Sequence, residues 1–202
     1  MNDIRFSLKA FMLNVVLWLP LMFFLWFYVS GLLIMPVQFG LDALLNLLYG
    51  DHFESVRRTA HLFEVGAIVT LPEGRAVAEI PVNPMIYGYG LPLVAGLVIA
   101  TPVAAGLRAL QLLGTYLGVV LVQLWGSFWE TFRVLAFELA EPGQAIVDAA
   151  GFPDEVIALC YQFGYLVLPA VVPVALWVLM NRTFIEGVVG HRIEPTPVDH
   201  GQ

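Results

Sequence analysis

Long apolar runs without a charged residue dominate the pattern of this chain. About 20 residues of α-helix cross the hydrocarbon core of a bilayer, because each residue advances the helix by about 1.5 Å. The pattern therefore predicts an all-α integral membrane protein with about four transmembrane helices. Their predicted bounds are residues 10–35, 91–107, 109–129 and 156–181.

We interpret the first predicted helix as a retained anchor. A secretory signal peptide also follows basic residues, but its apolar stretch is only about 7–15 residues long. The run from Ala10 to Met35 is longer, and no small-residue cleavage site follows it. We therefore expect this helix to remain in the protein.

The second and third predicted helices share one apolar region, residues 91–129, which contains a single charge at Arg108. As one helix this region would be about 58 Å long, far more than a bilayer requires. Two helices joined by a tight turn near Arg108 fit the bilayer better. Pro102 is expected to kink the first of them, and Pro169 and Pro173 to bend the last transmembrane helix.

Residues 36–90 form the longest segment outside the predicted spans. Leucines at helical spacing within residues 39–49 predict an interfacial helix that lies on the bilayer. Leu62–Leu71 and Arg75–Val82 contain β-branched runs and flank the turn Pro72–Gly74, which predicts a small β-hairpin. Two strands alone are barely stable in water, so the hairpin is expected to lean on the membrane, on the rest of the protein or on a partner.

Residues 130–155 form a second segment outside the predicted spans. The spacing of apolar residues predicts that the third helix continues outward to about Ala140. Glu141–Gly143 is expected to interrupt it, and Gln144–Ala150 to form a short helix.

Composition narrows the class of protein. Hydrophobic residues make up 59% of the chain and charged residues 12%, whereas a soluble domain has roughly 45–50% and about 25%. This balance excludes a cytosolic enzyme, a disordered protein and a nucleic-acid binder that needs a basic face. The single cysteine, Cys160, excludes a disulfide scaffold.

The charges predict how the chain is oriented, although the net charge of −7 does not. With four spans both termini lie on one side, and the basic residues of that side sit in short segments, as is typical of the cytoplasmic face. Residues 1–9 and 182–202 are therefore predicted to be cytoplasmic, with the polar end 193–202 disordered. The basic residues concerned are Arg5, Lys9, Arg108, Arg182 and Arg192.

The chain offers little catalytic chemistry. A catalytic thiolate needs a neighbouring His or Arg, and Cys160 lies in an apolar span without one. His52, His61, His191 and His200 show no metal-binding spacing. No acid or base lies at the centre of a span, which argues against a proton-coupled transporter. We predict no catalytic residue, no cofactor and no metal, and no enzymatic activity.

Small residues recur at spacings that allow close contact between membrane helices. Gly114 and Gly118 form a GxxxG motif, and Gly96 and Ala100 belong to a row of small residues. These four residues are candidates for helix packing. The alternative is chance, because such patterns are frequent in membrane helices.

Residues 81–92 combine prolines, tyrosines and glycines directly ahead of a predicted span. One interpretation is a stiff linker whose tyrosines sit among lipid headgroups. The other is a rigid aromatic corner on which a second membrane protein docks. The docking candidates are Asn83, Pro84, Tyr87, Gly88, Tyr89 and Gly90.

The same stretch carries a resemblance to a known family. It reads Asn-Pro-Met-Ile-Tyr-Gly-Tyr-Gly-Leu-Pro over Asn83–Pro92, and a charge-poor chain of this size with that motif resembles the exosortase H-associated membrane proteins of Gram-negative bacteria. The likeness covers the chain end to end, from an anchor through an outer loop to three further spans. It implies a small inner-membrane protein that accompanies an exosortase-type transpeptidase, which processes proteins with C-terminal sorting signals. The family has no assigned catalytic residues to carry over.

These observations lead to one favoured function and two alternatives. The favoured function is a non-enzymatic accessory or assembly partner of an exosortase-type sorting system, whose partners are a membrane protein and the lipid bilayer and not nucleic acid. Residues 36–90 and 130–155 are then periplasmic, and both termini are cytoplasmic. The alternatives are a structural subunit of a respiratory or secretion complex, and a small transporter or lipid-handling protein.

Overall fold

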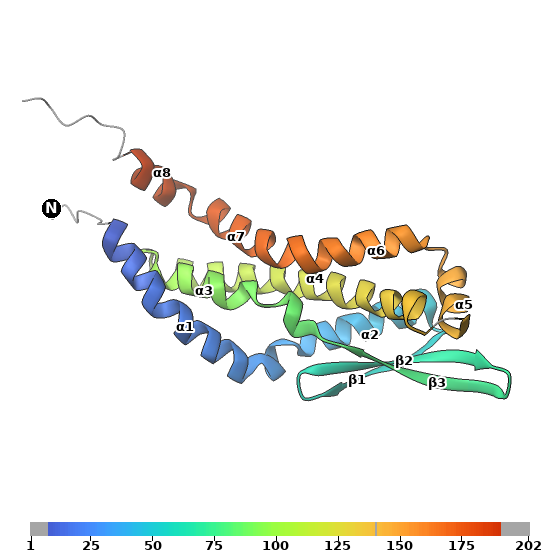
Figure 1. The fold of residues 1–202 in the computed structure, drawn as a ribbon. Helices are drawn as coiled ribbons and strands as arrows, with labels where there is room; N and C mark the ends of the chain where they lie inside the picture. The colour runs from blue at the N-terminus through green and yellow to red at the C-terminus, as the bar shows by residue number, and fades with distance from the viewer. Residues whose placement is uncertain (1–7, 140, 191–202) are drawn as a thin grey trace, which may run out of the picture.

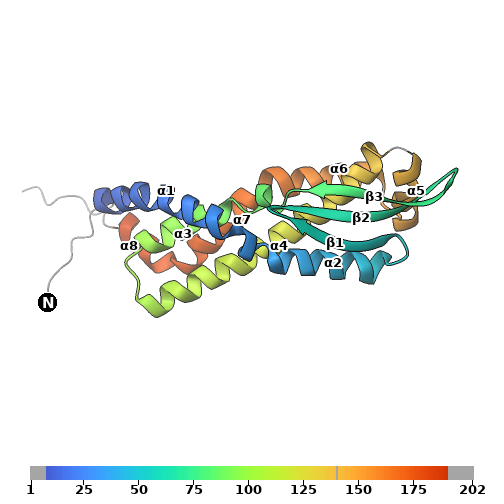
Figure 2. The same ribbon diagram turned by 90° about the horizontal axis from the view of Figure 1, so that it is seen from below.

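The computed structural model describes residues 8–139 and 141–190 of the chain. The predicted cytoplasmic N-terminus, up to residue 7, and the predicted disordered tail lie outside the described residues. Figures 1 and 2 show an elongated molecule in which helix α4 runs along most of the length. The helices are α1 (Leu8–Leu33), α2 (Met35–Tyr49), a 3₁₀ turn (Pro84–Tyr87), α3 (Gly90–Ala100), α4 (Ala105–Phe137), α5 (Glu141–Ala150), α6 (Asp154–Gln162), a π-helix (Phe163–Val167), α7 (Leu168–Met180) and α8 (Arg182–Gly190), and the strands are β1 (Phe53–Thr59), β2 (Leu62–Leu71) and β3 (Gly74–Val82).

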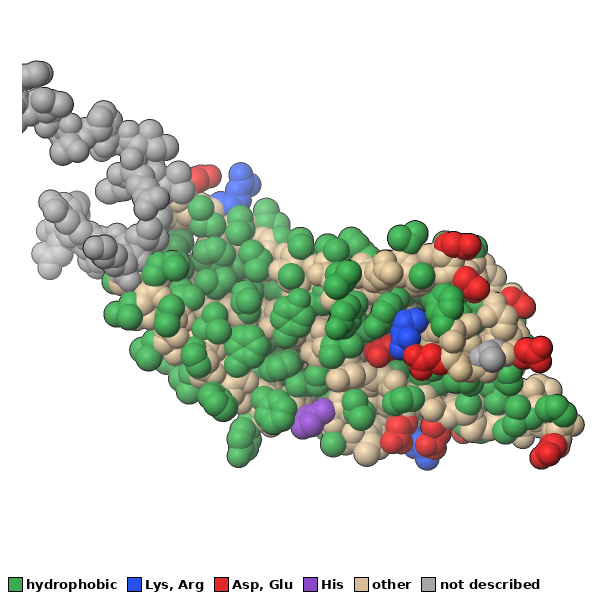
Figure 3. Space-filling view, viewed as in Figure 1, with side chains coloured by type: hydrophobic (Ala, Val, Ile, Leu, Met, Phe, Trp, Pro, Cys, Tyr) green, Lys and Arg blue, Asp and Glu red, His purple; other side chains and the backbone are tan. Residues whose placement is uncertain are grey.

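Among the described residues, three helices are long and apolar enough to cross a bilayer: Ala10–Leu33, Ala105–Phe137 and Asp154–Met180. They coincide with three of the four predicted spans, and the chain is a multi-pass membrane protein. Figure 3 shows hydrophobic side chains covering the end of the molecule that carries both described termini. We call this end the membrane half, and the opposite end, which carries the sheet, the extramembrane half.

The predicted span over residues 91–107 is not confirmed as a full crossing. Helix α3 has 11 residues and is about 16 Å long. It ends because Pro102 disfavours a helical conformation at the residue before it, and Thr101 is extended, with φ −74° and ψ 131°.

The turn between α3 and α4 therefore lies at residues 101–104, a few residues before Arg108, near which it was predicted. Arg108 lies in the first turns of α4, where its guanidinium donates to the carbonyls of Thr101 (3.3 Å) and Val103 (3.4 Å). The charge thus adds a second donor to the Thr101 carbonyl, which already accepts from the Val103 N–H (2.9 Å), and a donor to the Val103 carbonyl in the same turn.

Helix α3 packs along α1, and the two helices lie side by side in Figures 1 and 2. Gly96 faces the α1 backbone, where an added Cβ would lie 3.3 Å from Leu19 Cα. On the other side of the bundle, α7 runs next to α4. The last span contains a π-helix just before Pro169, which lacks the N–H that a regular helix would use there.

The sheet is antiparallel with strand order β1-β2-β3. The predicted hairpin corresponds to β2 and β3, but the prediction missed β1. In β1 the pairing with β2 shifts register between Phe53 and Val56, so its buried residues are three apart instead of two. The sheet packs against α2, α4 and α5, and its inner face is part of the core of the extramembrane half.

Helix α2 is present as predicted, and one of its sides is covered by this chain. Its fully buried residues Val37, Leu41 and Leu45 belong to the core between the sheet and α4. Gly40 lies against Leu124 of α4, and further along, the Tyr49 ring is 5.5 Å from the Phe132 ring. Helix α2 therefore runs alongside α4 and in the same direction.

Candidate functional site

The predicted docking corner, residues 83–90, lies where the membrane half meets the extramembrane half. The Asn83 side chain accepts a hydrogen bond from the Met85 N–H (3.1 Å) and begins the 3₁₀ turn. Pro84 follows it, at the first position of the turn, where a missing N–H costs little. The Gln123 side-chain amide donates to the Pro84 carbonyl (2.9 Å) and ties the corner to α4.

The ring of Tyr87 is fully buried against α4. It lies over Gly126, where an added Cβ would overlap the Tyr87 ring carbons. An added Cβ at Gly88 would similarly reach the Gln123 amide nitrogen at 2.5 Å. Glycine at these positions lets the corner approach α4 more closely than any other residue permits.

Tyr87 also has a polar partner inside the protein. Its hydroxyl donates a 3.1 Å hydrogen bond to Glu130 Oε2. Burial, and secondarily the Glu130 charge, raise the pKa of the Tyr87 phenol, so the hydroxyl stays protonated and remains a donor. The corner is thus attached to α4 by Gln123 on one side and Glu130 on the other.

The corner also contacts the last span. An added Cβ at Gly90 would overlap the Pro169 carbonyl oxygen and lie 2.5 Å from Pro173 Cγ. Gly90 therefore packs against the region just after the π-helix. The corner is wedged between α4 and α7 and joins the two halves of the molecule.

This geometry corrects part of the docking prediction. Pro84, Tyr87, Gly88 and Gly90 are buried, so Tyr87 does not offer its ring to a partner. The space at Gly88 and Gly90 is taken by neighbouring atoms of this chain, from Gln123 at Gly88 and from Pro169 and Pro173 at Gly90. Asn83 and Tyr89 remain half-exposed, and for Tyr89 docking stays a prediction.

The helix-packing candidates differ in how tightly they pack. An added Cβ at Gly118 would lie 2.5 Å from Leu176 of α7, whereas at Gly114 it would meet Met180 at an ordinary 3.8 Å. Gly96 makes the close contact with α1 described above, and Ala100 is half-buried. Gly118 thus allows the closer of the two α4–α7 contacts.

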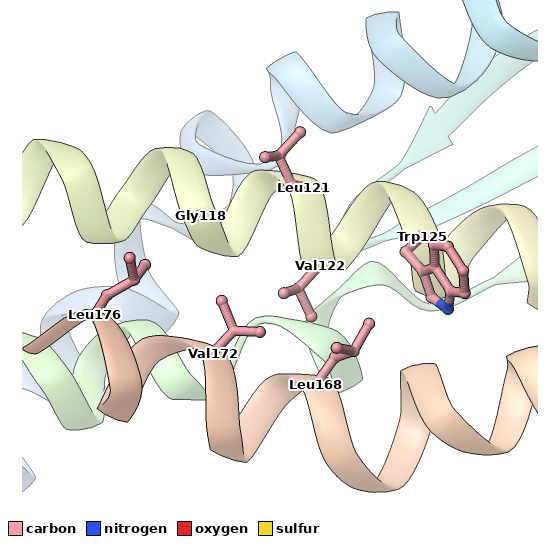
Figure 4. Close-up of a pocket in the computed structure, with 7 residues that line it drawn as sticks. All are labelled: Gly118, Leu121, Val122, Trp125, Leu168, Val172 and Leu176. Atoms are coloured by element: carbon pink, nitrogen blue, oxygen red, sulfur yellow. The ribbon is translucent and has the colours of Figure 1, made fainter. Parts of the chain in front are cut away.

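An apolar groove of about 390 Å³ lies beside Gly118 (Figure 4). Leu168, Val172 and Leu176 of α7 and Val122 of α4 point toward one another across it. No polar side chain converges on this space except the Trp125 indole, and Trp125 Nε1 already donates to the Cys160 carbonyl (3.0 Å). The groove therefore offers apolar contact and no acid–base chemistry.

Sequence reasoning missed the roles of Gly126, Glu130 and Arg133. Arg133 lies 4.9 Å from the centre of the Tyr161 ring and forms an ion pair of 2.7 Å with Glu138. The sequence does contain one indication of this site. Glu130 is the first charge after a long uncharged run, and a carboxylate next to a span is costly without a partner. Its partner is 43 residues away in the sequence, which no local pattern reveals.

Within residues 8–139 and 141–190, no group of three or more His, Cys, Asp or Glu side chains could hold a metal ion. Cys160 is a half-buried free cysteine, and its contact with Trp125 uses the backbone carbonyl rather than the thiol.

Cys160→Ser is therefore expected to leave the protein's abundance and its partner unchanged. A serine hydroxyl can bond back to a carbonyl of its own helix, and the Trp125 contact does not involve the side chain. The measurements are the amount of protein in membranes and the yield of co-purified partner per molecule. A lost activity at unchanged abundance would contradict the expectation and point to a catalytic thiol.

Comparison with known proteins gives one match. Residues 5–184 match the family described as "Exosortase H-associated membrane protein". No curated protein and no solved structure matches the chain.

Proposed function

The chain belongs to the exosortase H-associated membrane protein family, and on this premise we propose that it is a non-enzymatic accessory or assembly partner of an exosortase-type sorting system in the bacterial inner membrane. The observation that carries the proposal is the family match, which extends from the start of α1 through the last span. The family is named for association with exosortase H, so the proposed role is to bind and support that membrane protein.

The architecture supports a role in binding. Helix α4 has 33 residues and is about 50 Å long, whereas a bilayer core needs about 30 Å. The rest of α4 contacts α2, the sheet and α5, which on this proposal lie outside the bilayer. A membrane protein that builds such an extramembrane half next to its spans presents a fixed surface to a neighbour in the same membrane.

The proposal is tested by purifying the tagged chain from native membranes in a mild detergent and identifying the bound proteins by mass spectrometry. An exosortase-type protein is expected in stoichiometric amount. Recovery of a multi-subunit respiratory or secretion complex without an exosortase would overturn the proposal.

The proposed orientation has its own test. We expect a reporter fused after Asn181 to be active in the cytoplasm, and a reporter inserted near Glu73, in the β2–β3 turn, to be active in the periplasm. A periplasmic signal after Asn181 would show that α3 and the segment after it do not return the chain to the cytoplasmic side, and that the basic residues mislead about orientation.

A further inference from the structure

Two basic side chains attach the β1–β2 turn to the end of the first span. The Arg58 guanidinium donates to the Gly31 carbonyl, and a Cβ added at Gly31 would lie 3.9 Å from Arg58 Nη1. His61 Nδ1 lies 3.0 Å from the Ser30 hydroxyl oxygen, and the His61 ring lies 5.4 Å from the Phe27 ring. The guanidinium and the imidazole are therefore held on consecutive residues of α1. We call Arg58 and His61 the basic pair.

The register of the sheet explains why Arg58 reaches α1. Residues directly opposite one another in neighbouring strands share a face, and Arg58 lies opposite the fully buried Phe63 on the inner face of the sheet. Arg57 lies opposite Glu64 on the outer face, where it forms an ion pair with Glu79. The residues of β2 and β3 on the inner face are uncharged. Within residues 8–139 and 141–190, Arg58 forms no ion pair with a carboxylate, so its charge is left for a partner outside the chain.

The basic pair lies where α1 reaches the boundary of the hydrocarbon core. Ser30 comes 20 residues after Ala10, the start of the candidate span, and 20 helical residues advance by about 30 Å, the thickness of that core. Tyr28 in the same turn of α1 is 89% exposed, as is typical of tyrosines between lipid and water. Figures 1 and 2 show the β1–β2 turn at the end of the sheet nearest α1. The basic pair therefore lies at the level of the lipid phosphates.

Both members of the basic pair can donate to phosphate oxygens. A guanidinium has five N–H donors in a planar fork that matches phosphate, and the Gly31 carbonyl occupies only one of its nitrogens. The Ser30 hydroxyl donates its single proton to the Phe27 carbonyl (2.7 Å), so it accepts from the Nδ1–H of His61. In the protonated ring, Nε2 is then a second donor.

An apolar stripe leads along α1 from the basic pair into the membrane half. Leu13, Leu17, Phe24 and Phe27 are each more than half exposed in the described part of the chain. Their spacings of four, seven and three residues place them on one side of the helix, and Gly31 continues the same side. An acyl chain can therefore lie along this side of α1 while its headgroup meets Arg58.

We propose that the basic pair binds the phosphate of an anionic phospholipid, whose acyl chain lies along the apolar stripe of α1. The bilayer itself supplies phosphate at this level, and the binding of an anionic lipid by basic side chains beside a span follows from the same charge attraction. The bound lipid holds the β1–β2 turn, and with it the sheet, at the surface of the bilayer. This lipid site does not depend on the exosortase-type partner.

The test is a lipid titration of the purified full-length chain in detergent, with the unfolding midpoint as the measurement. A ligand that binds only the folded state raises this midpoint as its concentration exceeds the dissociation constant. The additives are phosphatidylglycerol, phosphatidylcholine and inorganic phosphate. Arg58→Gln removes the principal donor, and Arg57→Gln is the matched control, because this neighbouring arginine lies on the outer face and is paired with Glu79.

Phosphatidylglycerol is expected to raise the wild-type midpoint. Arg58→Gln is expected to need at least about tenfold more of this lipid for the same rise, because hydrogen bonds between charged groups are among the stronger ones. Arg57→Gln is expected to respond as the wild type does. His61→Gln leaves the Gly31 contact in place and is expected to weaken the response by a smaller factor, which keeps the proposal testable if Arg58→Gln does not fold.

Three results would overturn the lipid site. The first is a midpoint that phosphatidylglycerol does not change, or changes equally in the wild type and in both variants of the basic pair. The second is an equal rise with inorganic phosphate alone, which would indicate a site for a free anion. The third is an equal rise with phosphatidylcholine, which would indicate apolar contact without recognition of charge.

Discussion

Gly126→Ala is expected to destabilise the protein by about 1–3 kcal/mol, the usual cost of forcing an extra carbon into a packed core. The added Cβ would overlap the ring of Tyr87, which is fully buried and whose hydroxyl is held by Glu130. At a helix position without a close neighbour, a change from Gly to Ala would stabilise the protein by up to about 1 kcal/mol. A loss of stability therefore indicates that the added Cβ meets the Tyr87 ring. The measurement is the unfolding midpoint in detergent.

Gly114→Ala is the matched control on the same helix. There the nearest atom to an added Cβ is Met180 Sδ at 3.8 Å, and we expect no loss of stability. A double variant, Gly126→Ala/Tyr87→Leu, is expected to be less destabilised than the sum of its single changes, by about 0.5–3 kcal/mol. If Gly126→Ala matches Gly114→Ala in stability, Tyr87 does not pack against α4 as described.

Tyr87→Phe is expected to cost about 1–3 kcal/mol, because it leaves a buried acceptor on Glu130 without its donor. The ring and its packing on Gly126 are unchanged, so the loss reports the hydrogen bond. Tyr28→Phe is the matched control, since Tyr28 is 89% exposed and its hydroxyl is not buried as that of Tyr87 is. The measurement is again the unfolding midpoint, with the abundance of each variant in membranes.

The double variant Tyr87→Phe/Glu130→Leu separates the coupling between the two residues from the effect of each residue alone. Replacing both partners of a buried hydrogen bond by apolar groups costs far less than removing one of them. The double variant is therefore expected to lose less stability than the sum of the losses caused by Tyr87→Phe and by Glu130→Leu. Strict additivity of the two losses would mean that the hydroxyl and the carboxylate are not coupled.

The elements that depend on local pattern were predictable from the sequence. Uncharged runs indicated the long spans, and the turn Pro72–Gly74 indicated the β2–β3 hairpin, because helix length and turn chemistry depend on neighbouring residues only. Strand β1 was not predictable in this way, since its register shift breaks the alternation between Phe53 and Val56. The turn after α3 lies a few residues before Arg108, because Thr101 and Pro102 end the helix.

The site was harder to predict than the fold. The composition of residues 83–90 indicated a special corner, but not whether Tyr87 faces inward or outward. That choice is made by Gly126 and Glu130, which are distant in the sequence and offer, respectively, space for the ring and an acceptor for the hydroxyl. An aromatic residue between glycines fits a docking loop and an internal wedge equally well until its neighbours in space are known.

All three strands lie within residues 53–82, and this has a consequence for the order of folding during synthesis. Hairpins form in about 1–10 μs, whereas a ribosome adds about 5–20 residues per second. The sheet is therefore complete seconds before Phe132, the α4 ring against which Phe53 packs, has been made. During that interval the nascent chain exposes one apolar sheet face, and only α2 is available to cover it. Slowing translation just after the codon for Val82 is thus expected to increase proteolysis or chaperone capture of the nascent chain.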